Sequence, residues 1–70
     1  MRTVREVTTA ELQVGDVVDW HGKGRQVSEA RDTGTPAAVG RGTAFDVTLV
    51  DVDGREVALR AASSQRWLRL

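Results

Sequence analysis

Turn signals that contain glycine divide this chain at short intervals, and their spacing constrains the fold more than any other feature of the sequence. They are Val14-Gly15-Asp16, His21-Gly22-Lys23-Gly24, Thr33-Gly34-Thr35-Pro36, Gly40-Arg41-Gly42 and Asp53-Gly54. The segments between them are about five to nine residues long and rich in Val, Thr, Leu and aromatic residues, and none keeps a helical apolar period over about twelve residues. This spacing predicts an all-β barrel or sandwich.

The clearest predicted element is a hairpin formed by residues 44–51 and 56–61. Apolar residues alternate with polar ones in both segments, so that each strand has one apolar face. These apolar residues are Phe45, Val47 and Leu49 in the first strand and Val57, Leu59 and Ala61 in the second. The Asp53-Gly54 pair between the strands is typical of a tight hairpin turn, because it tolerates positive φ.

Two more strands are predicted at residues 16–20 and 25–31. The second alternates poorly, because Val27 shares its parity with Arg25, Glu29 and Arg31. We therefore expect a bulge, a strong twist or an edge position in this strand.

The rest of the chain contains weaker signals. Residues 33–43 contain several turn formers and little to bury, which predicts a mobile loop. Residues 62–65 predict a single helical turn, followed by a last strand at residues 66–70. The expected fold is a five-stranded domain over residues 11–70, with residues 1–10 as a loosely attached arm or an extra edge strand.

This order of elements, opened by Leu12-x-Val14-Gly15-Asp16-x-Val18, resembles small SH3-like barrels, including the KOW-type modules of transcription and translation proteins. The resemblance covers residues 11–70 and is one of architecture. It implies a five-stranded SH3-like barrel with a single helical turn before the last strand. The chain also looks like small barrels encoded by mobile elements of high-GC bacteria, which implies a bacterial or phage source. Because tyrosine is absent, the binding of proline-rich peptides by eukaryotic SH3 domains does not carry over.

The composition argues against several classes of protein. A chain of 70 residues is one domain with a small core, and without cysteine it has neither disulfides nor thiolate zinc sites. A single histidine cannot build a metal cage, and we expect no metal and no cofactor. Ten basic residues balance ten acidic ones, which argues against strong nonspecific binding of DNA. The first residues lack a long apolar run, so we expect no secretory signal, no membrane span and a cytoplasmic location.

The segment Trp20-His21-Gly22-Lys23-Gly24 lies where a hairpin turn is required. A catalytic interpretation would make His21 a general base oriented by Asp19, but no motif supplies a nucleophile. We therefore interpret the segment as a turn and expect no enzyme activity. Trp20 and Lys23 remain candidate binding residues.

The strongest candidate site is a basic strip near the C-terminus, which consists of Arg60, Arg66, Trp67 and Arg69. If Leu68 and Leu70 point into the core, parity turns Trp67 and Arg69 outward. An exposed indole between guanidinium groups can bind a peptide or stack on a base. The alternative is that Trp67 covers the open end of the barrel.

Two functions remain open. Balanced net charge favours a small non-enzymatic module that binds another protein. The alternative is a weak nucleic-acid-binding module of KOW type, which the basic strip favours: residues 54–70 hold Arg55, Arg60, Arg66 and Arg69 against Glu56.

Overall fold

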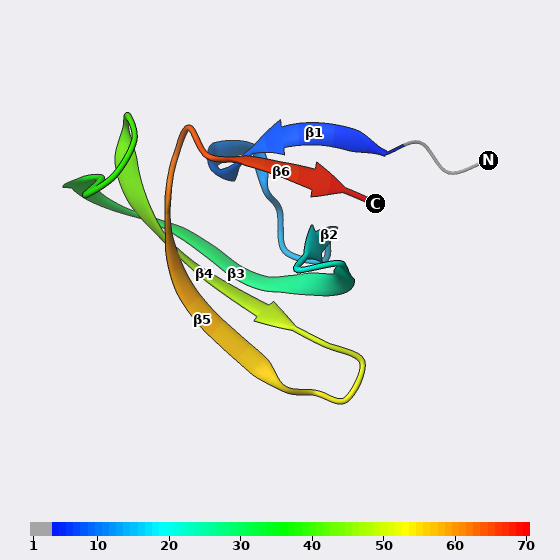
Figure 1. Cartoon of the computed structure of the whole chain (residues 1–70). Coiled ribbons are helices and arrows are strands. Elements are labelled where there is room, and N and C mark those ends of the chain that lie inside the picture. Colours follow the sequence, from blue (N-terminus) through cyan, green and yellow to red (C-terminus); the bar gives the residue numbers. More distant parts are fainter. Residues whose placement is uncertain (1–3) are drawn as a thin grey trace.

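The computed structural model describes residues 4–70, and these residues form one antiparallel sheet with almost no helix. Six strands occur in the order β1-β6-β2-β3-β4-β5 across the sheet (Figure 1). Their bounds are β1 Arg5–Thr8, β2 Val17–Trp20, β3 Lys23–Pro36, β4 Thr43–Val50, β5 Glu56–Ala62 and β6 Arg66–Arg69, with a short 3-10 helix, η1, at Thr9–Glu11. The all-β prediction is confirmed.

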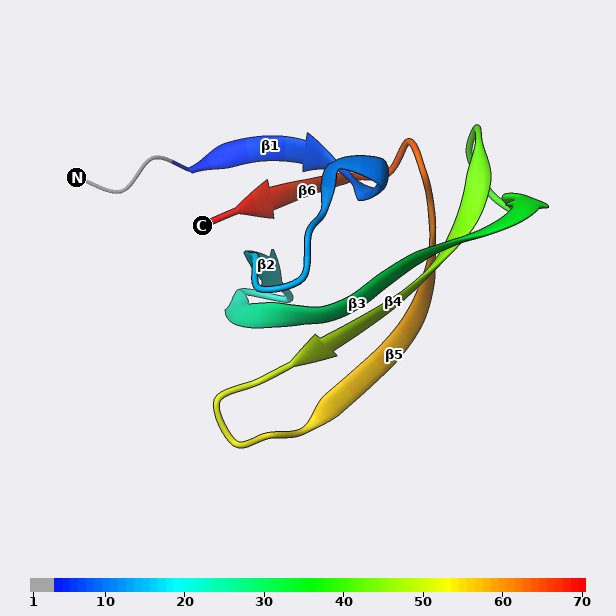
Figure 2. The same cartoon turned by 180° about the vertical axis from the view of Figure 1, so that it is seen from behind.

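The five-stranded closed barrel is not confirmed, because the sheet has six strands within residues 4–70 and is open. Of the two alternatives for residues 1–10, the structure has the extra edge strand. The additional strand is β1, which lies at one edge of the sheet and pairs with β6 from Arg5 opposite Arg69 to Thr8 opposite Arg66. The sheet bends so that β1 and β6 lie over β3, β4 and β5, but it does not close, and β1 and β5 are its two edges (Figures 1 and 2). One physical reason is that β1 and β2 occupy both sides of β6.

The hairpin of β4 and β5 forms as predicted, with the apolar residues of each strand on one face. Val47 lies opposite Leu59 and Leu49 opposite Val57, and the apolar side chains share the concave face of the sheet. In the turn, Gly54 adopts a φ of 82°, and its N–H donates to the Asp51 carbonyl at 3.1 Å. Positive φ at Gly54 but not at the preceding residue indicates a loop with a glycine in the left-handed position, in place of a two-residue primed turn.

Strand β3 is longer than predicted and contains the expected bulge. The register shifts between Val27 and Glu29, so that Val27 and Ala30 both contact the core although their parity differs. The strand continues to Pro36, and the Thr33 hydroxyl donates to the Ala44 carbonyl at 2.7 Å. The loop predicted at residues 33–43 is therefore confined to residues 37–42. A second register shift follows Asp32, and the pairing with β4 resumes at Pro36, which lies opposite Thr43.

The single helical turn is not where the sequence predicts it. Residues 62–65 form a turn in which the Gln65 N–H donates to the Ala62 carbonyl at 2.9 Å. The helical turn is η1, where the Thr8 N–H donates to Glu11 Oε1 at 2.9 Å. This carboxylate satisfies a backbone donor at the start of the helix, which stabilises η1.

The core lies between the two halves of the bent sheet. Its buried members are small except for one indole: Val7, Leu12, Val18, Val27, Val47, Leu49, Ala61 and Trp67. Trp20, Ala30, Phe45 and Leu59 pack against them and are partly buried.

Candidate functional site

Trp67 belongs to the core, so the outward-facing position, one of the two that the sequence left open for this residue, is wrong. Its side chain is 4% exposed, and its Nε1–H donates to the Thr9 hydroxyl at 2.8 Å. The Trp20 ring stacks on it, with ring centroids 5.6 Å apart. The physical reason is register: Trp67 lies opposite the buried Val7, and a core of small aliphatic residues gains most by burying an indole.

Leu68 and Leu70 consequently lie on the outer face of the sheet, where they are 44% and 42% exposed. The Leu70 N–H donates to the Val17 carbonyl at 2.8 Å, which brings β2 next to the end of β6. A Cβ atom added to Gly24 would lie 3.4 Å from Leu70 Cδ1 and 3.5 Å from Val17 Cγ1. Two exposed apolar side chains, Val17 and Leu70, therefore lie against a residue without a side chain.

A shallow hollow extends this apolar surface toward the turn after β4. Val17 and Gly24 line it together with Gln26, Val50, Asp51 and Val52. Val52 is 97% exposed, and the turn that presents it is held by Asp51 Oδ1, which accepts the N–H groups of Asp53 and Arg55 at 2.9 Å each. We call Val17, Gly24, Val50, Val52, Leu68 and Leu70 the outer patch.

Charged side chains lie beside the outer patch at two places, near Leu68 and at Asp51. Glu6 lies opposite Leu68 in the β1–β6 ladder and forms an ion pair with Arg66 at 2.9 Å. Asp51 is paired with Arg25 at 3.7 Å, and hydrogen bonds from the backbone N–H of Arg55 and then of Asp53 lower the pKa of its carboxyl group. An apolar centre with a charged rim is the usual anatomy of a protein interface.

Sequence reasoning missed the outer patch, although one signal was present. Val17 and Val18 are adjacent in a four-residue strand, so one of the two must face away from the core. Val18 is fully buried, and Val17 is the outward residue.

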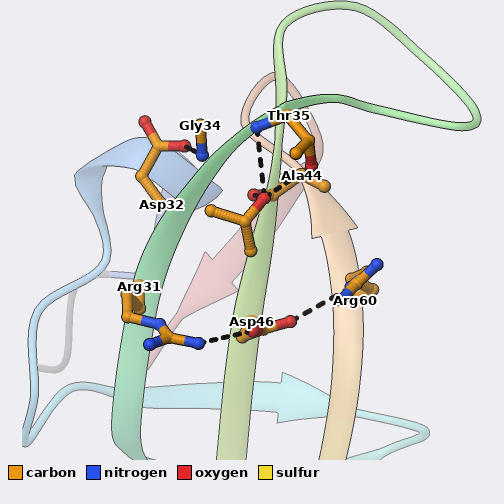
Figure 3. Close-up of polar contacts among 8 residues, drawn as sticks. Arg31, Asp32, Gly34, Thr35, Ala44, Asp46 and Arg60 are labelled. Atoms are coloured by element: carbon orange, nitrogen blue, oxygen red, sulfur yellow. Dashed lines mark hydrogen bonds and ion pairs between the residues drawn. The ribbon is translucent and has the colours of Figure 1, made fainter.

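The structure separates the members of the predicted basic strip. Arg69 shares the concave face with Trp67, whereas Arg60 lies on the outer face of β5, so the expected single outward face does not exist. Figure 3 shows Arg60 and Arg31 on either side of Asp46, and the ion-pair distances are 3.1 Å and 3.0 Å. Hydrogen bonds from Arg31 and Arg60 lower the pKa of the Asp46 carboxyl group.

Arg69 faces a second arginine. It lies opposite Arg5 in the β1–β6 ladder and opposite Val18 in β2. The carboxylate of Glu11 reduces the local excess of positive charge. Hydrogen bonds from the Thr8 N–H and hydroxyl lower the pKa of Glu11, and the charges of Arg5 and Arg69 lower it by a smaller amount.

Trp20 and Lys23 flank a two-residue turn made of His21 and Gly22, whose φ angles are 53° and 81°. Positive φ at both central residues is the geometry of a tight primed turn. His21 packs edge-on against Trp20, with ring centroids 4.4 Å apart. This segment therefore joins β2 to β3, as the sequence predicts.

The serine hydroxyls near the C-terminus hold the 37–42 loop. Ser64 Oγ donates to the Arg41 carbonyl at 2.7 Å and accepts the Arg41 N–H at 3.3 Å. Ser63 Oγ accepts the Thr43 N–H at 3.1 Å.

Two kinds of structural feature are absent from residues 4–70. In this part of the chain, no group of three or more His, Cys, Asp or Glu side chains is arranged to hold a metal ion. Nor does it contain a helix long and apolar enough to cross a membrane.

No model of a known protein family matches the chain, and no curated protein matches it in sequence.

Proposed function

We propose that this chain is a small, non-enzymatic module that binds another protein through the outer patch. The observation that carries the proposal is the exposure of Leu68, Leu70 and Val17 side by side on β6 and β2. Scattered apolar residues are normal on a protein surface, but a contiguous group with a charged rim is typical of an interaction site.

The expected partner presents apolar side chains to the patch and charged groups to its rim. Gly24 leaves room at the centre for a side chain of the partner, because its position lies in contact distance of Val17 and Leu70 but holds no side chain. Glu6 and Arg66 offer one charge of each sign beside Leu68. A partner with mixed charges around an apolar contact fits this arrangement better than a polyanion.

The proposal includes an SH3-like connectivity and a cytoplasmic location. Support for the connectivity comes from the meander of β2, β3, β4 and β5, after which β6 returns to pair with β2. The added strand β1 and the open sheet are departures from that pattern.

The outer patch can be tested with a double variant, Leu68→Ser with Leu70→Ser. Both side chains are exposed, so folding should change by about 1 kcal/mol or less. A partner captured from the native cell and identified by mass spectrometry should bind the wild type and lose the double variant. Val39→Ser is the matched control, because Val39 is 85% exposed in the 37–42 loop, away from the patch. A partner that binds the double variant as well as the wild type would overturn the proposal.

A second candidate function is weak nucleic-acid binding of KOW type. One observation favours it: Arg5 and Arg69 face each other on the concave side, where the partly buried Trp20 stacks on Trp67. Affinity for a single-stranded oligonucleotide, measured at about 50 and 200 mM salt, would distinguish the two functions, since binding driven by phosphates weakens steeply with salt. Lys23→Ala with Arg69→Ala should remove this binding and leave the protein partner bound.

A further inference from the structure

The free edge of β5 offers an ordered row of backbone groups. Backbone hydrogen bonds join Asp51 to Arg55 at one end of the β4–β5 ladder and Ser63 to Thr43 at the other. In an antiparallel pair, every second residue of a strand bonds to its neighbour, so the backbone groups of Val57, Leu59 and Ala61 point toward β4. The N–H and C=O groups of Glu56, Ala58 and Arg60 therefore point away from the sheet. Within residues 4–70, no strand pairs with this edge (Figure 1).

β5 lacks two of the features that usually protect an edge strand, proline and a bulge. Its sequence, Glu-Val-Ala-Leu-Arg-Ala-Ala, contains no proline, and its ladder with β4 contains no register shift. Two charged residues are present, Glu56 and Arg60, and they have opposite signs and equal spacing from Ala58.

We propose that two copies of this chain pair through β5, antiparallel about a two-fold axis at Ala58. In this register Glu56 of one copy lies opposite Arg60 of the other, twice, and the outward backbone groups of all three residues find partners. The occupant of the edge is a second copy because the strand is complementary to itself. The inference does not rest on the outer patch, although Val50 of that patch lies opposite Glu56 in the β4–β5 ladder.

Charge selects this register over its neighbours. A two-fold axis at Glu56 or at Arg60 would place like charges directly opposite each other, which destabilises an antiparallel pair. An axis at Val57 or Leu59 would leave both charges opposite uncharged residues. Only the axis at Ala58 pairs each charge with its opposite.

The neighbouring ion pairs strengthen this preference. Asp46 is shared by Arg31 and Arg60, so the cluster carries one positive charge in excess (Figure 3). Arg60 uses Nε for Asp46, and its side chain is 70% exposed, which leaves its terminal nitrogens for a carboxylate of the second copy. Glu56 makes no ion pair within residues 4–70 and would supply that carboxylate.

The concave face supplies the apolar half of the contact. Val57 and Leu59 are partly buried at the edge of the sheet, and Leu59 packs against the core. In the proposed register Val57 of one copy lies opposite Leu59 of the other, so that both gain cover. Cross-strand apolar pairs of this kind stabilise a sheet.

The first test is the mass of the protein across a range of concentrations, measured by analytical ultracentrifugation. The wild type should approach twice the monomer mass as concentration rises. Glu56→Arg should weaken the dimer about tenfold or more, because it places arginine opposite Arg60 in both pairs. Asp19→Arg is the matched control: it makes the same change of charge on β2, which β3 and β4 separate from β5, and should leave the dimer intact.

A mixture of variants tests the register directly. Glu56→Arg and Arg60→Glu should each be monomeric alone, and their mixture should form a heterodimer in which both ion pairs are restored. Ala58→Pro should also prevent pairing, since it removes only an N–H that points away from β4. Circular dichroism of each variant shows that the fold is retained.

A cross-link gives a readout that does not depend on charge. The chain contains no cysteine, so Ala58→Cys introduces a single thiol. Facing residues in an antiparallel pair have Cα atoms about 4.5–5.5 Å apart, which is within the range of a disulfide. Under a mild oxidant this variant should form a covalent dimer, and Ser28→Cys, an exposed site on β3, should not. A wild type that is monomeric at every concentration, or a dimer that survives both Glu56→Arg and Ala58→Pro, would overturn the proposal.

Discussion

Thr9 is a fully buried polar residue that connects η1 to the core. Its hydroxyl accepts the Trp67 Nε1–H at 2.8 Å and donates to the Gln65 carbonyl at 3.3 Å. A buried donor without a partner costs free energy, so the position of the indole depends on this one hydroxyl.

Thr9→Val should therefore destabilise the fold by about 1–3 kcal/mol, because it retains the shape of threonine and leaves the indole N–H unpaired. The midpoint of urea unfolding, followed by tryptophan fluorescence, measures the change. Thr35→Val is the control, since Thr35 is exposed and its side chain bonds only to Thr33. Equal shifts of the two midpoints would contradict the assigned role of Thr9.

Asp46 gives the fold an acid-sensitive contribution. Hydrogen bonds from Arg31 and Arg60 hold the pKa of its carboxyl group below the ordinary value of 3.8. A pKa lowered by folding adds stability above 3.8, and this stability is lost as the pH falls through the lowered value. Between about pH 5 and pH 2, the melting temperature of Asp46→Asn should therefore fall by fewer degrees than that of the wild type.

The control for this prediction is Asp19→Asn, which removes a carboxylate that has no ion pair within residues 4–70. Its melting temperature should fall with acid as steeply as that of the wild type. Parallel acid profiles for the two variants would show that the Arg31–Asp46–Arg60 cluster does not contribute.

At the scale of residues, the sequence is misleading in β6. In Trp67-Leu68-Arg69-Leu70, two leucines alternate with tryptophan and arginine, and this pattern favours a strand that buries the leucines and exposes Trp67. In the structure Trp67 is buried instead, because it contacts Thr9 and Val7, residues about sixty positions away in the chain. Contacts of that range leave no local signal in the sequence.

At the scale of elements, regular alternation decided which strands could be predicted. The β4–β5 hairpin alternates in both strands, and it forms with the expected apolar faces. The β3 bulge was also signalled, by the mismatch around Val27. The extension of β3 to Pro36 was not signalled, because it runs through the turn-forming residues 33–35 before the pairing with β4 resumes at Pro36. The outer patch was missed for the same reason as Trp67, because it contains Leu68 and Leu70, which the sequence pattern places inside.

β1 is part of the sheet in the structure, and a substitution of its buried residue, Val7, tests whether it contributes to stability. Val7 is 4% exposed, whereas Val4, just before the strand, is 55% exposed. Val7→Ala should cost about 2 kcal/mol from lost burial and the remaining cavity. Val4→Ala should cost much less, and chemical denaturation compares the two. Equal small costs would mean that residues 5–8 behave as a loosely attached arm.

The 37–42 loop depends on a close approach to Ser63. Gly42 has a φ of 92°, and a Cβ added there would overlap the Ser63 hydroxyl, which is held by Thr43. Gly34 has a similar φ of 75° but open space around it. Gly42→Ala should therefore be more destabilising than Gly34→Ala in thermal melts, because both carry backbone strain and only the first adds a steric overlap. A smaller loss at Gly42 would contradict the docking of the loop on Ser63.

At the scale of the whole molecule, strands from opposite ends of the chain pair with each other. β1 and β6 form one ladder, and β6 also contacts β2, so the core is complete only when distant segments meet. This topology predicts slow folding for a chain of 70 residues, on the scale of milliseconds to seconds. Stopped-flow fluorescence of Trp20 and Trp67 measures the rate, and folding in microseconds would show that local contacts suffice.

The pairing of Arg5 with Arg69 also determines how the molecule responds to tension. A force applied between these two residues acts across the β1–β6 ladder, nearly along its hydrogen bonds, and loads one pair at a time. β1 should therefore peel away stepwise at low force, beginning at Arg5 and reaching Val7 before Thr8. Once the pair of Val7 and Trp67 opens, the indole loses its cover on that side, and the molecule converts a small pull into the exposure of a tryptophan.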